Sequence, residues 1–162
     1  MTDLLALLQE FYRDKLSILL RHADGARHVS QYDFNNTYQY ILNREDAQLS
    51  WVGKAIEELG GTLPEANGVP RQAGGKGEAA ARTVFDEDAR DAQAFVDRWR
   101  PRIDAMTNAR HAKMLHVILG EVLEQKRFFE QALAGRTDLL GRRAEQIVGP
   151  AIGEVLPTRW VE

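Results

Sequence analysis

Apolar residues recur at every third or fourth position along four stretches of this chain, which is the spacing of an α-helix that buries one face. Strand-like alternation is almost absent, and glycine follows three of the four stretches, as is common at helix C-termini. The predicted helices run from about Asp3 to Ala23, from about Gln31 to Leu59, from about Asp86–Asp88 to Met106 and from about Asn108 to Ala134. The pattern predicts an all-α four-helix bundle.

A long connection, residues 61–85, separates the second and third predicted helices. It is rich in Gly, Pro and Ala, and it ends at three consecutive acids, 86–88, which favour a helix N-terminus. A long connection at this place favours two antiparallel helix pairs joined by a crossover, rather than four helices joined by short loops. The whole chain, 1–162, is predicted as one domain. It comprises a bundle at about 3–135 and a C-terminal extension, 136–162, with a short helical segment near 138–148.

One carboxylate interrupts the apolar face of the second helix. The face reads Phe34, Tyr38, Ile41, Glu45, Gln48, Val52, Ala55, Leu59, and six of these eight residues suit a buried position. Burying a carboxylate without a partner costs several kcal/mol or forces it to take a proton, so Glu45 must have a partner. The fourth helix repeats the pattern as Met114, Ile118, Glu121, Gln125, Phe128, Ala132. Two helices are therefore expected to present one acid each to a common interior.

Both acids belong to short motifs. The second helix reads Glu45-Asp46-Ala47-Gln48 and then Trp51, and the fourth reads Glu121-Val122-Leu123-Glu124 and then Phe128. Both resemble the rubrerythrin-type Glu-x-x-His motif of ferritin-like di-iron proteins, in which an aromatic residue follows. The resemblance covers about residues 3–135. It implies a ferritin-like fold and places a residual metal site at Glu45, Gln48, Glu121 and Glu124, with Gln48 and Glu124 where the family has histidine.

The first and third helices offer few further ligands. Their inward positions are Leu8, Phe11, Tyr12, Ala92, Phe95 and Trp99. A hard cation needs several converging oxygen ligands, so this set favours a structural polar cluster over a di-iron centre. In that cluster each acid could bond Gln48, Gln125, a tyrosine hydroxyl or Lys15, which lies unexpectedly on the apolar stripe of the first helix. His22 and His28 flank the first loop and are expected to face solvent.

These observations favour a ferritin-like bundle with a degenerate, metal-free carboxylate site that acts through binding or assembly, without a cofactor. Two alternatives stay open. One is a di-metal carboxylate oxidase or ferroxidase that uses iron or manganese with an atypical ligand set. The other is a small-molecule-binding bundle in which a pocket at Glu45 and Glu121 takes a cationic ligand.

Composition restricts the partners. The net charge of −3 gives no basic face for nucleic acid, and no run of about 18 apolar residues suggests a membrane span. The N-terminus lacks a signal-peptide pattern, and the chain has no cysteine, which fits the cytoplasm. Trp51, Trp99 and the Phe128–Phe129 pair are expected in the core or in subunit contacts, so a homodimer is open. The sequence does not identify a protein partner.

Overall fold

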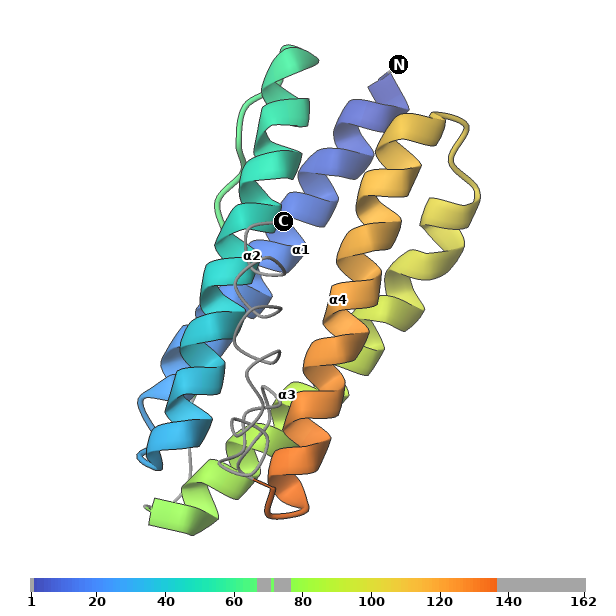
Figure 1. The fold of residues 1–162 in the computed structure, drawn as a ribbon. Coiled ribbons are helices and arrows are strands. Elements are labelled where there is room, and N and C mark those ends of the chain that lie inside the picture. Colours follow the sequence, from blue (N-terminus) through green and yellow to red (C-terminus); the bar gives the residue numbers. More distant parts are fainter. Residues whose placement is uncertain (1, 67–70, 72–76, 137–162) are drawn as a thin grey trace, which may run out of the picture.

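The computed structural model describes residues 2–66, 71 and 77–136, and in these residues it contains four helices and no strand. They are α1 (Thr2–Ala26), α2 (Tyr32–Glu58), α3 (Gly77–Asp104) and α4 (Ala109–Leu133) (Figure 1). The prediction of an all-α four-helix bundle is confirmed. The short helical segment expected near 138–148 lies outside the described residues.

The helices pack most extensively as two neighbouring pairs, α1 with α2 and α3 with α4. Smaller contacts join α1 to α3 and α2 to α4. Within each pair the two helices run in opposite directions, whereas α2 and α3 run in the same direction (Figure 1). The end of α2 and the start of α3 therefore lie at opposite ends of the bundle.

The third helix begins earlier than the sequence predicted. It starts at Gly77, a residue with a positive φ of 68°, so the expected start at 86–88 and the crossover bounds of 61–85 are wrong. The acids that suggested a helix start lie inside the helix, where Asp86 is exposed, Glu87 is half-buried and Asp88 is fully buried. Consecutive helical residues point in different directions, so neighbouring acids can lie in different environments.

The caps of two helices explain their starting points. Gln31 precedes α2 and accepts a hydrogen bond from the backbone N–H of Phe34 through Oε1 (2.8 Å). Asn108 precedes α4 and does the same for His111 through Oδ1 (3.0 Å). Each cap satisfies one of the backbone donors that a helix N-terminus leaves unpaired. The boundaries of α2 and α4 thus lie within one residue of the sequence prediction.

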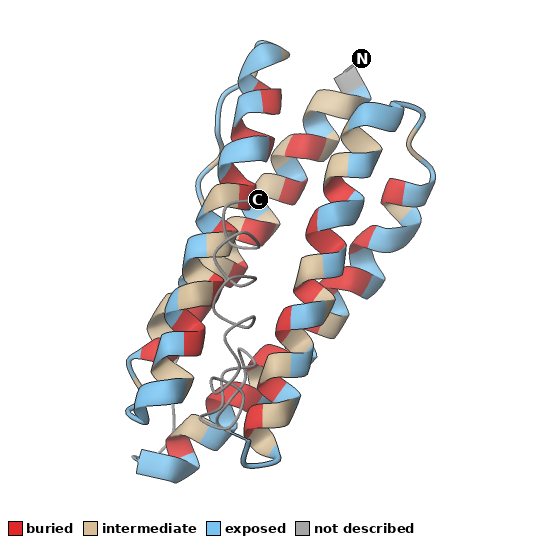
Figure 2. Ribbon diagram, in the orientation of Figure 1, coloured by how far each residue is buried: buried red, intermediate tan, exposed pale blue. Residues whose placement is uncertain are grey.

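Two apolar clusters form the interior of the bundle. Figure 2 shows the buried positions recurring along each of the four helices. The larger one includes Phe11, Val52, Phe95, Trp99 and Leu115. The smaller one includes Val29, Tyr38, Ile41, Val84, Phe85 and Phe129. Along α1, α2 and α3, buried polar residues lie on the same inward faces as these two sets. The functional site is built on those positions.

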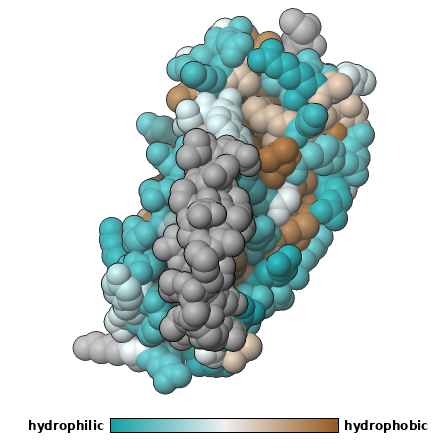
Figure 3. Space-filling view, in the orientation of Figure 1, coloured by the Kyte–Doolittle hydropathy of each residue, from teal (hydrophilic) through white to brown (hydrophobic). Residues whose placement is uncertain are grey.

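The surface is mainly hydrophilic in the view of Figure 3, with apolar side chains gathered in a band along one side. The large apolar residues that remain exposed among the described residues are Leu20, Tyr32, Trp51, Leu63 and Val117. Trp99, in contrast, is fully buried, so Trp51 and Trp99 lie in different environments. None of the described helices combines the length and apolar character needed to cross a membrane.

Candidate functional site

Glu45 is fully buried on α2, and two side chains of α1 hold its carboxylate. Lys15 forms an ion pair with Oε2 through Nζ, and His22 places Nδ1 2.7 Å from Oε1. Lys15 and His22 are themselves almost completely buried. The prediction that Glu45 has a buried partner is confirmed, and Lys15 is one of the partners that the sequence suggested.

His22 connects Glu45 to a second buried acid, Asp88 of α3. Nε2 of His22 lies 3.9 Å from Oδ1 of Asp88, a distance that allows electrostatic attraction but no hydrogen bond. The Tyr38 hydroxyl donates a hydrogen bond to Oδ2 of Asp88 at 2.5 Å, and Arg71 donates to Oδ1 from Nη1 at 2.7 Å. These contacts define the buried polar network, which consists of Lys15, His22, Tyr38, Glu45, Arg71 and Asp88.

Helical spacing brings these groups together. Lys15 and His22 are seven residues apart on α1, and Tyr38 and Glu45 are seven apart on α2, so each pair lies on one helix face about two turns apart. Asp88 faces them from α3. Aromatic rings cover the network, with Phe129 centred 5.3 Å from the His22 ring and Lys15 Nζ 6.0 Å from the centre of Phe95.

The charges at Glu45 and His22 stabilise each other. Burial raises the pKa of Glu45, but the charges of His22 and Lys15 and their hydrogen bonds outweigh burial and lower it to about 2. Burial also disfavours the imidazolium of His22, but the carboxylates of Glu45 and Asp88 outweigh that effect, so the pKa of His22 is raised. Glu45 is therefore a carboxylate near neutral pH, and His22 keeps its proton to a higher pH than an isolated imidazole.

The environment of Asp88 disfavours its charged form. Burial raises the pKa of Asp88, although His22, Arg71 and Tyr38 all act in the opposite direction. Burial and the neighbouring Asp88 carboxylate raise the pKa of Tyr38 well above its ordinary value, so Tyr38 stays a phenol that donates its proton. Arg71 stays charged because the attraction of Asp88 outweighs burial and raises the pKa of its guanidinium.

The structure separates the four residues that were predicted as a residual metal site. Glu121 is half-buried, and Arg44 binds both of its oxygens, with Nε–Oε1 at 2.9 Å and Nη2–Oε2 at 2.8 Å. Glu124 is exposed. Gln48 is fully buried beside Glu45 on α2, and neither of its amide atoms has a hydrogen-bond partner among the described residues. Glu45 and Glu121 therefore have different partners, and the expectation that both face a common interior holds only for Glu45.

This donor set does not fit a di-metal centre. Within residues 2–66, 71 and 77–136, no group of three or more His, Asp or Glu side chains is arranged to hold a metal ion. Lys15 and His22 hold the two oxygens of Glu45, and Arg44 holds those of Glu121. A divalent cation would have to displace basic side chains at both acids. Of the four predicted residues, Gln48 alone offers a buried oxygen without a partner.

Sequence reasoning missed half of this network. His22 was expected in solvent, but it lies two turns after Lys15 on the same helix face, and that spacing is a signal that could have found it. Asp88 was assigned to a helix start, although it fits the inward stripe that continues through Ala92 and Phe95. Arg71 carries no such periodic signal, because it lies in the connection between α2 and α3.

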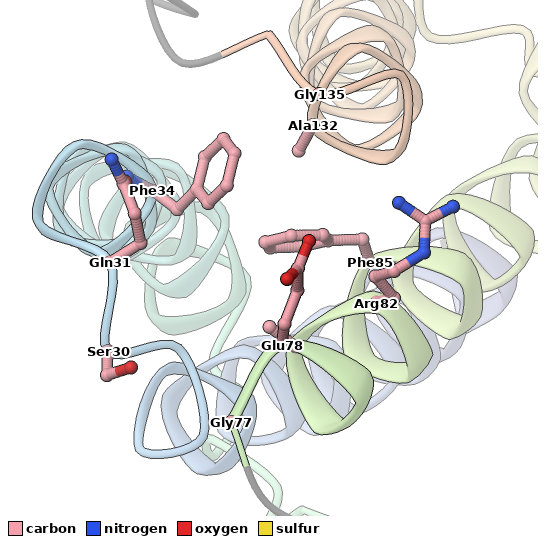
Figure 4. Close-up of a pocket in the computed structure, with 10 residues that line it drawn as sticks. Ser30, Gln31, Phe34, Gly77, Glu78, Arg82, Phe85, Ala132 and Gly135 are labelled. Carbon is pink, nitrogen blue, oxygen red and sulfur yellow. The ribbon is translucent and has the colours of Figure 1, made fainter.

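A separate cavity of about 520 Å³ opens at the end of the bundle where α2 and α3 begin and α4 ends (Figure 4). The rings of Phe34 and Phe85 flank it, with their centres 5.0 Å apart, and Glu78 projects beside them. Arg82 turns towards α4, where its Nη1 donates to the Leu133 carbonyl (3.0 Å). Neither Glu45 nor Glu121 lines this cavity.

Comparison of the chain with protein-family models, curated proteins and solved structures gives no match.

Proposed function

We propose that this protein is a ferritin-like bundle whose acidic interior is neutralised by its own basic side chains, and that it acts through binding or assembly. The helix directions and the long connection between α2 and α3 support this fold assignment, because ferritin-like bundles have one long crossover. The Glu45 and Glu121 motifs described above support it as well.

The observation that carries the proposal is the way in which Glu45 is held. In a di-metal carboxylate protein the buried acids are free to bind metal, and the charge of the metal compensates theirs. Here the ammonium of Lys15 and the imidazole of His22 bind the two oxygens of Glu45 and compensate its charge in place of a metal. The interior carboxylate thus serves to position and stabilise the helices, which leaves the surface of the bundle for interactions.

Elemental analysis of protein purified without a chelator tests the proposal. We expect well under one tightly bound iron, manganese or zinc ion per chain, because Lys15 and His22 compete for the oxygens of Glu45. The matched control is Glu45→Gln, which keeps the shape of the side chain and removes its charge, and which should give the same low metal content. About two ions per wild-type chain, lost in Glu45→Gln, would show that the proposal is wrong.

Two specific observations favour alternative functions. The unpartnered amide of Gln48 favours a metal or polar guest beside Glu45, as in a carboxylate oxidase or ferroxidase that uses iron or manganese. The cavity between Phe34 and Phe85 favours a small-molecule-binding bundle, at a different place from the pocket expected at Glu45 and Glu121. Metal-dependent consumption of oxygen would support the first, and ligand-induced shifts in the NMR signals of Phe34 and Phe85 would support the second.

A further inference from the structure

Arg71 is bound more completely than any surface arginine described above. Its guanidinium donates to two backbone carbonyls, from Nη1 to Arg21 and from Nη2 to Val84, both at 3.0 Å. It also binds two carboxylates, Asp88 at 2.7 Å and Glu87 at 3.1 Å from Nη2 and 3.3 Å from Nε. Only 2% of its side chain is exposed. Every nitrogen of the guanidinium therefore has an acceptor.

The acceptors belong to helices, and Arg71 belongs to the connection between α2 and α3. Val84, Glu87 and Asp88 lie within one and a half turns of α3, and the Arg21 carbonyl lies on α1. Each α-helix supplies its own backbone hydrogen bonds. The two carbonyls are consequently positioned by secondary structure, and α3 carries the two carboxylates on neighbouring residues.

Gly25 of α1 provides the space for the guanidinium. A Cβ atom at this position would lie 2.7 Å from Nη1 of Arg71 and 2.9 Å from Cγ1 of Val84, closer than such atoms approach in proteins. Gly25 is buried in the last turn of α1. The absence of a side chain here is what allows the guanidinium to reach its acceptors.

We propose that these acceptors form a guanidinium-binding site, occupied in cis by Arg71, whose ligand class is a guanidinium group on an aliphatic stem. A planar guanidinium presents five N–H donors in a fixed fork, which matches two carbonyls and two carboxylates placed around it. An ammonium group has three donors around one atom and cannot reach all of these acceptors. A free guanidinium compound on a short aliphatic stem has the chemistry to occupy this site once the Arg71 side chain is removed.

The test removes the side chain and restores it as a separate molecule. Arg71→Ala lacks the part of arginine beyond Cβ, and ethylguanidinium supplies the same atoms. We expect low millimolar ethylguanidinium to raise the thermal midpoint of Arg71→Ala by several degrees, because a ligand that binds only the folded state stabilises it. Ethylammonium at the same concentration should raise the midpoint much less. Equal rescue by both compounds, or by neither, would refute the proposal.

Two further variants show whether the rescue belongs to this site. Arg71→Ala/Asp88→Asn removes the charge of the main acceptor and should lose the response to ethylguanidinium. Arg44→Ala removes a half-exposed arginine that also binds a carboxylate through two contacts, and it should not respond. Rescue of all three variants alike would mean that ethylguanidinium acts non-specifically, which would contradict the proposal.

Arg71→Ala is expected to be destabilised because Asp88 loses the cation that hydrogen-bonds to it, and the variant is then unfolded at room temperature if this loss exceeds the stability of the bundle. In that case the readout is the far-ultraviolet circular dichroism signal of the helices. Recovery of this signal with ethylguanidinium, but not with ethylammonium, supports the site. A chain that stays unfolded with both compounds refutes it.

Discussion

The ammonium of Lys15 compensates the charge of Glu45 inside the bundle, where an unpaired carboxylate would cost several kcal/mol. His22 adds a second positive group on the other oxygen of Glu45. Breaking such a pair from one side leaves an uncompensated buried charge, whereas replacing both members removes the charge altogether. This difference makes the arrangement testable at single residues.

We predict that Lys15→Met lowers the free energy of unfolding by about 3–5 kcal/mol, because Glu45 then loses one of its two cations. Lys15→Met/Glu45→Gln should recover most of that loss, since the neutral amide can still accept a hydrogen bond from His22. Urea denaturation at neutral pH measures the free energy of unfolding of the wild type and of both variants. A double variant that is no more stable than Lys15→Met would contradict the assigned role of Lys15.

Acid should weaken the contribution of Glu45. Its pKa is about 2 in the folded protein and 4.5 for the unperturbed carboxyl group, so its stabilising effect is complete above about pH 5 and disappears towards pH 2. The shift corresponds to roughly 3 kcal/mol. We predict that the difference in unfolding free energy between wild type and Glu45→Gln, measured with urea, decreases by about that amount between pH 5 and pH 2. A difference that does not change with pH would contradict the lowered pKa.

At the scale of the elements, α3 shows what the sequence could and could not predict. Its inward residues Ala92, Phe95 and Trp99 follow a helical period and are buried as expected. Its start was predicted about nine residues too late, since the acids at 86–88 resemble an N-terminal turn and hide the buried position of Asp88. Helix period depends on local sequence, whereas the partner of a buried acid depends on which other helix faces it.

The same limit applies to the site. Glu45 was identified because a carboxylate on an apolar stripe is anomalous, and Lys15 stood out for the same reason. Arg71 could not be found in this way, since the connection that contains it has no periodic face against which an anomaly would show. The pairing of Arg44 with Glu121 was also missed, because half-buried ion pairs between helices leave no pattern in one sequence.

Two helix glycines provide a matched test of the packing between α1 and α3. We predict that Gly25→Ala destabilises the protein by about 1–3 kcal/mol, because the new Cβ would displace Arg71 or Val84. Gly120→Ala on α4 is the control. A Cβ there meets nothing within 4 Å, so this change should stabilise by roughly 0.5–1 kcal/mol through helix propensity. If thermal or urea denaturation showed stabilisation by both changes, the close approach at Gly25 would be wrong.

At the scale of the whole molecule, polar contacts join the two helix pairs alongside the apolar contacts of the core, such as that of Phe11 with Trp99. At the middle of α1, Asp14 accepts hydrogen bonds from Arg98 (2.7 Å) and from the indole of Trp99 (2.6 Å) on α3. Deeper inside, Glu45, His22 and Asp88 link α2, α1 and α3 in succession. The two carboxylates that suggested a metal centre thus connect helices through basic side chains of the chain itself, Glu45 to α1 and Glu121 to α2.

The most direct test of this account is the thermal midpoint of the wild type, measured with and without added Mn²⁺ or Fe²⁺ beside Glu45→Gln. A ligand that binds the folded state raises the midpoint. Because Lys15 and His22 hold the oxygens of Glu45, the account predicts that neither metal raises the wild-type midpoint. A midpoint that climbs with metal in the wild type, and stays unchanged in Glu45→Gln, would contradict it.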